Sequence, residues 1–173
     1  MKRAAITTVL GAMILTTACD SQRVESEAPQ AEALPQTEPL EVFEVGATAE
    51  TGFIGFTLKS IETKKAVRDP DWSPPAGPGE TFVVARYEIK NRGEEPLDPF
   101  ELPQIALIDD NGVEYSWDAE ASTSDGDSSG WDAINPGVVY KGTRSFKVVE
   151  ERYDPEAWQI VIKTDPAIAY RLK

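Results

Sequence analysis

The sequence predicts an all-β protein, an antiparallel β-sandwich of about seven strands. The stretch 81–91 alternates apolar and polar residues with a period of two, which is typical of a strand with one face in a core and one in water. Short segments rich in β-branched and aromatic residues recur along the rest of the chain between turn residues, with almost no helical periodicity. In 81–91 the residues predicted to face the core are Val83, Ala85, Tyr87 and Ile89.

The other predicted strands follow from the same pattern and from the turn residues between them. In the first, Phe56, Leu58 and Ser60 share one face, and four prolines between residues 64 and 80 exclude regular pairing there. Asn111-Gly112 predicts a tight hairpin turn, and the small, polar segment 119–132 predicts a loop. The predicted strands are 52–63, 81–91, 101–109, 113–118, 138–149, 157–164 and a last edge at 168–172.

Residues 1–18 are predicted to be a targeting segment. A basic start is followed by an apolar run that is too short for a stable membrane span, and small residues precede Cys19. This pattern resembles the lipobox of bacterial lipoproteins, in which the cysteine is diacylated and becomes the new N-terminus. Asp20 resembles the signal that retains such proteins at the inner membrane. The alternative is an ordinary secretory signal with a chance cysteine.

Residues 19–44 are predicted to be a lipidated cysteine followed by a flexible acidic tether, and the folded domain is predicted to span 45–173. The tether is rich in Glu, Ala, Pro, Gln and Ser, so it cannot bury enough apolar surface to offset its ordering entropy. Its alternative role is a short motif that binds a partner.

Three phrases resemble one known family. They are 79–84 (GETFVV) leading to 90–93 (KNRG), 107–115 (LIDDNGVEY), and 134–137 (INPG) followed by Gly142 and 145–148 (SFKV). Together they resemble the domain of unknown function 4352, a telokin-like, immunoglobulin-like domain of exported bacterial lipoproteins. The resemblance implies an immunoglobulin-like sandwich without a disulfide and a non-enzymatic role. One departure is that Val149 and Glu150 stand where the family usually has a proline.

The segment 125–132 (DGDSSGWD) resembles half of a calcium loop. Oxygen atoms at alternate positions can converge on a hard cation, with Asp125, Asp127, Ser129 and Asp132 as the candidate ligands. The bidentate Glu expected after such a loop is missing, because Pro136 stands near that position. The alternative is a solvated acidic loop without a cofactor.

Tryptophans beside carboxylates suggest a second kind of site. Trp72 and Trp131 fall in predicted loops, where flat rings could stack on sugars of a glycan. In the alternative interpretation Trp72 pins the proline-rich segment, while Trp117 and Trp158 cap the core.

Composition restricts the function. The chain has no histidine and a single cysteine, so nucleophilic triads and the usual zinc sites have no residues to build them. The formal charge is -13, and removal of a leader that carries Lys2 and Arg3 and no acid lowers it to -15. Such a charge disfavours nucleic acid and anionic lipid surfaces as partners. We therefore expect no enzyme, but an envelope lipoprotein that binds another protein; the alternative is a glycan- or calcium-binding module.

Overall fold

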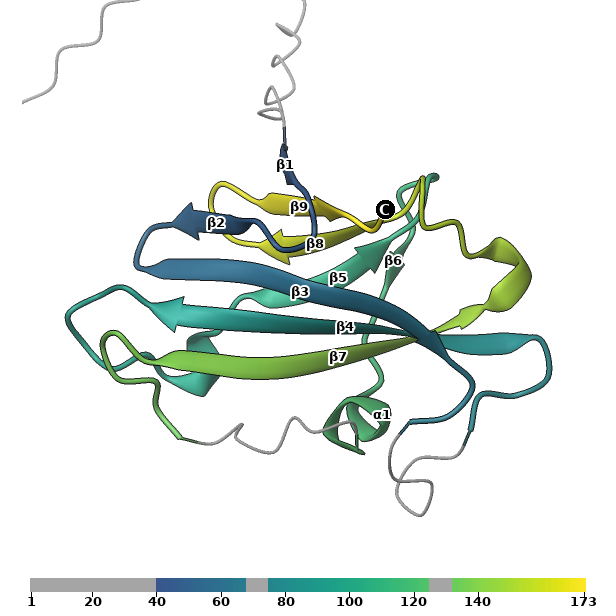
Figure 1. Cartoon of the computed structure of the whole chain (residues 1–173), viewed down its shortest axis with the longest axis horizontal. Helices are drawn as coiled ribbons and strands as arrows, with labels where there is room; N and C mark the ends of the chain where they lie inside the picture. Colours follow the sequence, from purple (N-terminus) through teal and green to yellow (C-terminus); the bar gives the residue numbers. More distant parts are fainter. Residues whose placement is uncertain (1–39, 68–74, 125–131) are drawn as a thin grey trace, which may run out of the picture. The chain divides into compact units, whose positions relative to one another are not determined.

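The chain folds into two β-sheets that face each other across a shared core (Figure 1). The structure is a computed structural model that describes residues 40–67, 75–124 and 132–173. Within these residues one sheet has the order β1-β9-β8-β5-β6 and the other β2-β3-β4-β7, and all pairs are antiparallel except β1 with β9. The predicted antiparallel sandwich is confirmed. The strands are β1 (Glu41–Phe43), β2 (Thr48–Thr51), β3 (Ile54–Lys64), β4 (Glu80–Asn91), β5 (Gln104–Ile108), β6 (Glu114–Tyr115), β7 (Val139–Val149), β8 (Gln159–Lys163) and β9 (Ile168–Arg171); the helices are η1 (Pro99–Glu101), α1 (Ala119–Ser124) and η2 (Glu150–Arg152).

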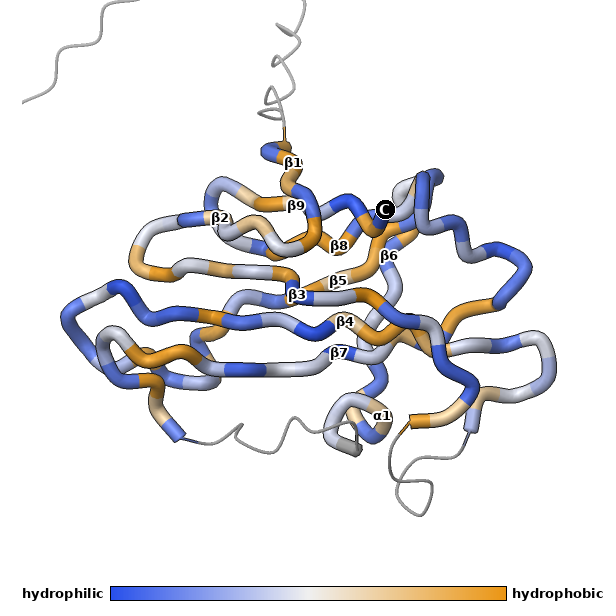
Figure 2. The backbone as a smooth tube through the Cα atoms, viewed as in Figure 1, coloured by the Kyte–Doolittle hydropathy of each residue, from blue (hydrophilic) through white to orange (hydrophobic). Residues whose placement is uncertain are grey.

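The core is built by alternate residues of the strands, and apolar and polar residues follow one another along the tube in Figure 2. The inward residues of β4 are those predicted, from Val83 to Ile89. From the other sheet, Leu107 of β5 and Ile160 of β8 belong to the same buried cluster. Trp158 is also buried there, as the core-capping interpretation expects.

A β-bulge in β3 changes which side chains face inward. The register with β4 shifts between Leu58 and Ser60, so that Leu58 pairs with Tyr87 while Ile61 pairs with Ala85. One extra residue reverses the alternation beyond it. Ile61, and not Ser60, therefore packs against the core, and the predicted position of Ser60 on the face of Phe56 and Leu58 is wrong.

The start of the predicted loop 119–132 is instead a short helix. In α1 (Ala119–Ser124) the carboxylate of Asp118 accepts a hydrogen bond from the Ala121 amide (2.9 Å), which caps the first turn. Ala121 is fully buried against Phe82 and Val84 on the outer face of β4. That end of the outer face is thus covered, although the alternation in 81–91 predicted it to face water.

The folded domain begins before residue 45, inside the segment predicted as tether. β1 runs parallel to β9, and Phe43 packs against the Tyr170 ring with the ring centroids 5.7 Å apart. A strand of only three residues has too short an alternation of apolar and polar residues to be recognised within a polar segment. Residues 1–39 lie outside the described part. In the residues described, no helix is long and apolar enough to cross a membrane.

We predict that Tyr153 makes the domain sensitive to alkaline pH. Its ring meets Trp158 edge-on (5.4 Å between centroids), and burial raises the pKa of Tyr153 from 10.0 to about 12, with Asp154 contributing. The folded state therefore holds the phenol proton more tightly than the unfolded chain does. This stabilisation is complete below pH 10 and is lost as the pH rises towards 12. As the pH rises between these values, the free energy of unfolding measured in urea should fall less for Tyr153→Phe than for the wild type. Equal losses of this free energy would contradict the prediction.

Candidate functional site

The structure describes only part of the residue sets predicted to bind ligands. Cys19, Trp72, Asp125, Asp127, Ser129 and Trp131 lie outside the described residues, as does Asp20. Asp132 is described and exposed. Over the described ranges, no group of three or more Cys, Asp, Glu or His side chains is placed to hold a metal.

Trp117 does not cap the core as one interpretation predicted. It is 42% exposed, and the guanidinium carbon of Arg144 lies 4.4 Å from the centre of its ring. Arg144 belongs to the inward face of β7, pairs with Ala85 and also lies over the Tyr87 ring at 5.7 Å. Arg144 therefore lies between the core and Trp117, which explains why the indole is left at the surface.

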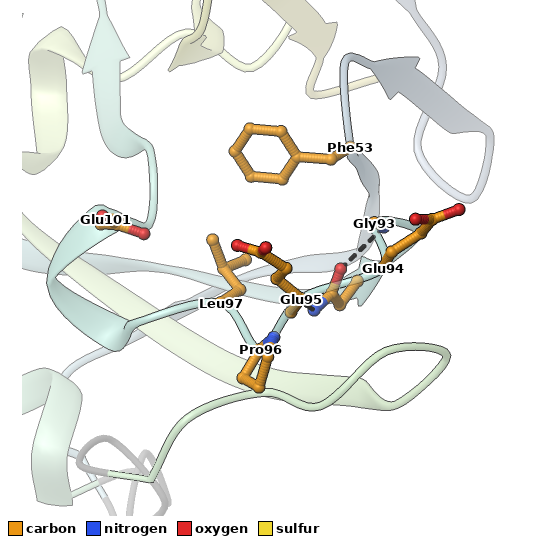
Figure 3. A pocket seen from close by; sticks show the side chains of 8 residues that line it. Phe53, Gly93, Glu94, Glu95, Pro96, Leu97 and Glu101 are labelled. Carbon is orange, nitrogen blue, oxygen red and sulfur yellow. Dashed lines mark hydrogen bonds between the residues drawn. The ribbon is translucent and has the colours of Figure 1, made fainter.

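The best-defined candidate site is a hollow at one end of the sandwich, where β4 ends. We call it the end hollow. It has a volume of about 310 Å³ and is bounded by Phe53 on one side and by the segment 94–97 and Glu101 on the other (Figure 3). Its lining residues are Phe53, Asn91, Gly93, Glu94, Glu95, Pro96, Leu97 and Glu101.

Asn91 holds the frame of the end hollow together. Its side chain is 1% exposed, and its amide nitrogen donates to the carbonyl oxygens of Ile134 (2.7 Å) and Glu95 (2.8 Å). Its amide oxygen accepts from the Gly93 backbone N–H (2.8 Å). The nitrogen and oxygen of this one amide group thus connect two loops that are distant in sequence.

Backbone pairing completes this frame. Leu97 and Ile134 exchange two hydrogen bonds of 2.9 Å, and the Arg92 N–H donates to the Phe53 carbonyl (2.7 Å). A Cβ on Gly93 would lie 3.3 Å from the Cβ of Phe53, so glycine at this position gives the Phe53 side chain its room. The walls of the hollow are therefore fixed by hydrogen bonds before any ligand arrives.

On the side of the hollow opposite Phe53, the chain forms the short helix η1 (Pro99–Glu101). The Asp98 carboxylate accepts from the Phe100 N–H (2.8 Å), and proline begins the helix with the backbone angle that a first turn needs. This turn places Glu101 at the rim of the hollow. Phe100, on the same turn, is 81% exposed.

The end hollow combines apolar walls with a negative rim. Phe53, Pro96 and Leu97 supply the apolar surface, and the charged lining residues are Glu94, Glu95 and Glu101. Among the lining residues there is no lysine or arginine, and the neighbouring Arg92 makes an ion pair with Glu50 of β2. The arrangement can bind a group that is apolar and positively charged. The ionisable groups among its lining residues are the three glutamates, and these residues include no histidine, cysteine, serine or lysine.

A second hollow of about 340 Å³ lies on the other side of the Leu97–Ile134 pairing. It is lined by Asp132, Ala133, Ile134, Val138, Val139, Tyr140 and Lys141. Its lining begins at Asp132, the first described residue after the gap at 125–131.

The most buried carboxylate of the described chain belongs to a turn. Asp109, 6% exposed, accepts hydrogen bonds from the backbone N–H groups of Asn111 (2.9 Å) and Val113 (2.8 Å). Its other oxygen lies 3.3 Å from the Tyr115 hydroxyl. These contacts shape the predicted hairpin turn, so this carboxylate has a structural role.

The end hollow was not predicted from the sequence. In the acidic, proline-containing segment 92–101 (RGEEPLDPFE), residues 92–100 were predicted to connect two strands and Glu101 to begin the strand 101–109. The available signal was the coincidence of four carboxylates with Phe100 in ten residues that contain a single arginine.

Comparison with known proteins assigns the family. Residues 43–169 match the family described as domain of unknown function DUF4352. The chain belongs to the DUF4352 family. The predicted resemblance to this family is thereby confirmed. The match includes the whole β2-β3-β4-β7 sheet, strands β5, β6 and β8 of the other sheet, and every residue that lines the end hollow.

The chain is also similar in sequence to a curated protein and in fold to several solved structures. The chain is 26% identical over 136 residues to the uncharacterized protein YxkC of Bacillus subtilis, covering 75% of this chain and 76% of YxkC. A conserved hypothetical protein from Bacillus anthracis superposes with a TM-score of 0.64 at 23% identity, over 73% of this chain and 94% of its own. The ycdA protein of Bacillus subtilis, described as a candidate lipoprotein, superposes with a TM-score of 0.51 at 12% identity, over 71% of this chain and 37% of its own.

Proposed function

We propose that this DUF4352 protein is an extracytoplasmic lipoprotein, anchored through Cys19, whose sandwich binds another protein of the cell envelope. The observation that carries the binding role is the end hollow, where Phe53 is 56% exposed over a cavity framed by Asn91. Apolar side chains held open to solvent on a rigid frame are typical of interaction sites. The residue types of the whole chain favour binding over catalysis, because histidine is absent and the one thiol is the proposed acylation site.

Anchoring is supported by the lipobox-like sequence before Cys19. It is also supported by ycdA, the structural neighbour that is described as a candidate lipoprotein. Two or more acyl chains give stable membrane binding, since each buried CH₂ adds ~0.8 kcal/mol. Asp20 favours the inner membrane as the location. Cys19→Ser should therefore move the protein from the membrane fraction to the soluble fraction, measured by fractionation and blotting. Persistence of the serine variant in the membrane fraction would contradict lipid anchoring through Cys19.

The binding role is tested by capture of a partner from solubilised membranes. The wild type should recover one protein in stoichiometric amount, and Phe53→Ser should lose it. A matched control is Val113→Ser, which removes another exposed apolar side chain, 48% exposed, in the turn between β5 and β6. Retention of the partner by Phe53→Ser would remove the end hollow from the proposal. If no protein is recovered while glycan binds, or calcium raises the melting temperature, the alternative binding module is favoured.

A further inference from the structure

We propose that the end hollow receives a single lysine or arginine side chain from a basic segment of the partner protein. This inference rests on the proposed binding function and adds the chemistry of the partner. It follows from the size of the hollow, the nature of its walls and the charge at its rim.

The size of the hollow suits one side chain. Ligand pockets for drug-sized molecules are roughly 300–1,000 Å³ and enclose most of the ligand. At about 310 Å³ and open to solvent, the end hollow stands at the lower limit of that range. This volume is large enough for one amino-acid side chain, and the walls and the rim determine which kind of side chain fits.

The walls suit the stem of a basic side chain. Phe53 presents its ring from the β2–β3 turn, and the Leu97 side chain lies across from it (Figure 3). Lysine and arginine pack their methylene groups along apolar surface while the charged group stays hydrated. The face of an aromatic ring also attracts a cation that approaches within about 6 Å of the ring centre.

The rim suits the charged head of that side chain. Glu95 and Glu101 line the hollow from two different segments, so a cation that enters it is attracted by carboxylates of both (Figure 3). Both residues are exposed, which means that neither carboxylate has been desolvated before binding. The net charge of the chain adds a long-range attraction for basic partners and raises their rate of encounter.

The frame limits the entropic cost of binding. The Asn91 side-chain amide donates a hydrogen bond to the Glu95 carbonyl, which holds the loop that carries Glu95. Leu97 is bound to Ile134 by two hydrogen bonds. Little backbone freedom is left to lose when a side chain enters. Weak but specific recognition of one residue is therefore expected even in a short peptide.

The test uses the full chain carrying Cys19→Ser and the peptide acetyl-Ala-Ala-Arg-Ala-Ala-amide, with binding followed by NMR. Signals of Phe53, Glu95 and Leu97 should shift on titration. The peptide with citrulline in place of arginine, which has the same shape without the charge, should bind about tenfold more weakly, a difference of ~1.4 kcal/mol. Raising the salt concentration should weaken the arginine peptide alone, because the rim is exposed.

A pair of charge-matched variants isolates the rim. E95Q/E101Q should weaken arginine-peptide binding about tenfold. E151Q/E156Q removes the same charge from η2 and the segment after it, which follow β7 at the end away from Asn91, and should leave binding within about twofold. Equal effects of the two variants, or equal affinity for the citrulline peptide, would overturn the inference. The partner capture tests the binding function separately. If Phe53→Ser loses the partner while peptide binding does not depend on charge, the binding function stands and the cationic ligand is refuted.

Discussion

Asn91→Ala should destabilise the domain by roughly 3 kcal/mol, because it removes three hydrogen bonds and leaves the Glu95 carbonyl and the Gly93 N–H without this partner, while the Ile134 carbonyl keeps the Leu97 N–H. The side chain is 1% exposed and pairs with the carbonyls of Glu95 and Ile134 and with the Gly93 N–H. A buried polar group that loses its hydrogen bond costs about 1–3 kcal/mol, and the truncation also leaves a small cavity. Urea unfolding followed by tryptophan fluorescence measures this loss.

A second substitution at the same position separates hydrogen bonding from packing. Asn91→Asp keeps the volume, but it replaces two donated hydrogen bonds with a carboxylate that faces two carbonyl oxygens. It should therefore destabilise the domain at least as much as Asn91→Ala. Asn111→Ala is the control, since that side chain makes only an exposed contact with Asp110 and should change stability by less than about 0.5 kcal/mol. If Asn91→Asp were as stable as the wild type, the frame described for the end hollow would be wrong.

The strands could be predicted from sequence because their information is local. Alternation along β4 identified its core face residue by residue, and Asn111-Gly112 identified the turn between β5 and β6. The bulge after Leu58 could not be predicted, since it is fixed by pairing with β4 and leaves no turn residue in the strand. Helix α1 was hidden by its polar composition, and the Asp118 cap together with the burial of Ala121 against Phe82 explains why it forms.

The end hollow depends on information that is not local. Phe53 comes from the turn before β3, Glu95 from the segment after β4, and Glu101 from η1. The hydrogen bond from Asn91 to Ile134, 43 residues apart in sequence, brings their loops together. An isolated asparagine at the end of a strand is typical of many turns, so its role as a central hydrogen-bonding residue could be recognised only in the folded structure.

Gly142→Ala should also destabilise the domain strongly, by about 3 kcal/mol, through overpacking. Gly142 pairs with Tyr87 across β7 and β4, and the phenol ring lies over the glycine. A Cβ at this position would lie within 3.0 Å of three atoms of that ring, while Tyr87 is held by its stacking on Phe56 at 5.4 Å. A well-packed core cannot move such a ring without strain, which costs about 1–3 kcal/mol and occasionally more.

Two comparisons test whether the clash with Tyr87 is the cause. Gly55→Ala is the control, because Gly55 also lies in a strand, near the start of β3, but its added Cβ would meet the flexible Arg92 side chain at 3.4 Å. It should be close to neutral. In a double-mutant cycle, Tyr87→Leu should relieve much of the effect of Gly142→Ala, so that the double variant is more stable than the sum of the single losses predicts. Additive losses would mean that the ring can move aside, and that glycine at 142 is needed for some reason other than the room it leaves for Tyr87.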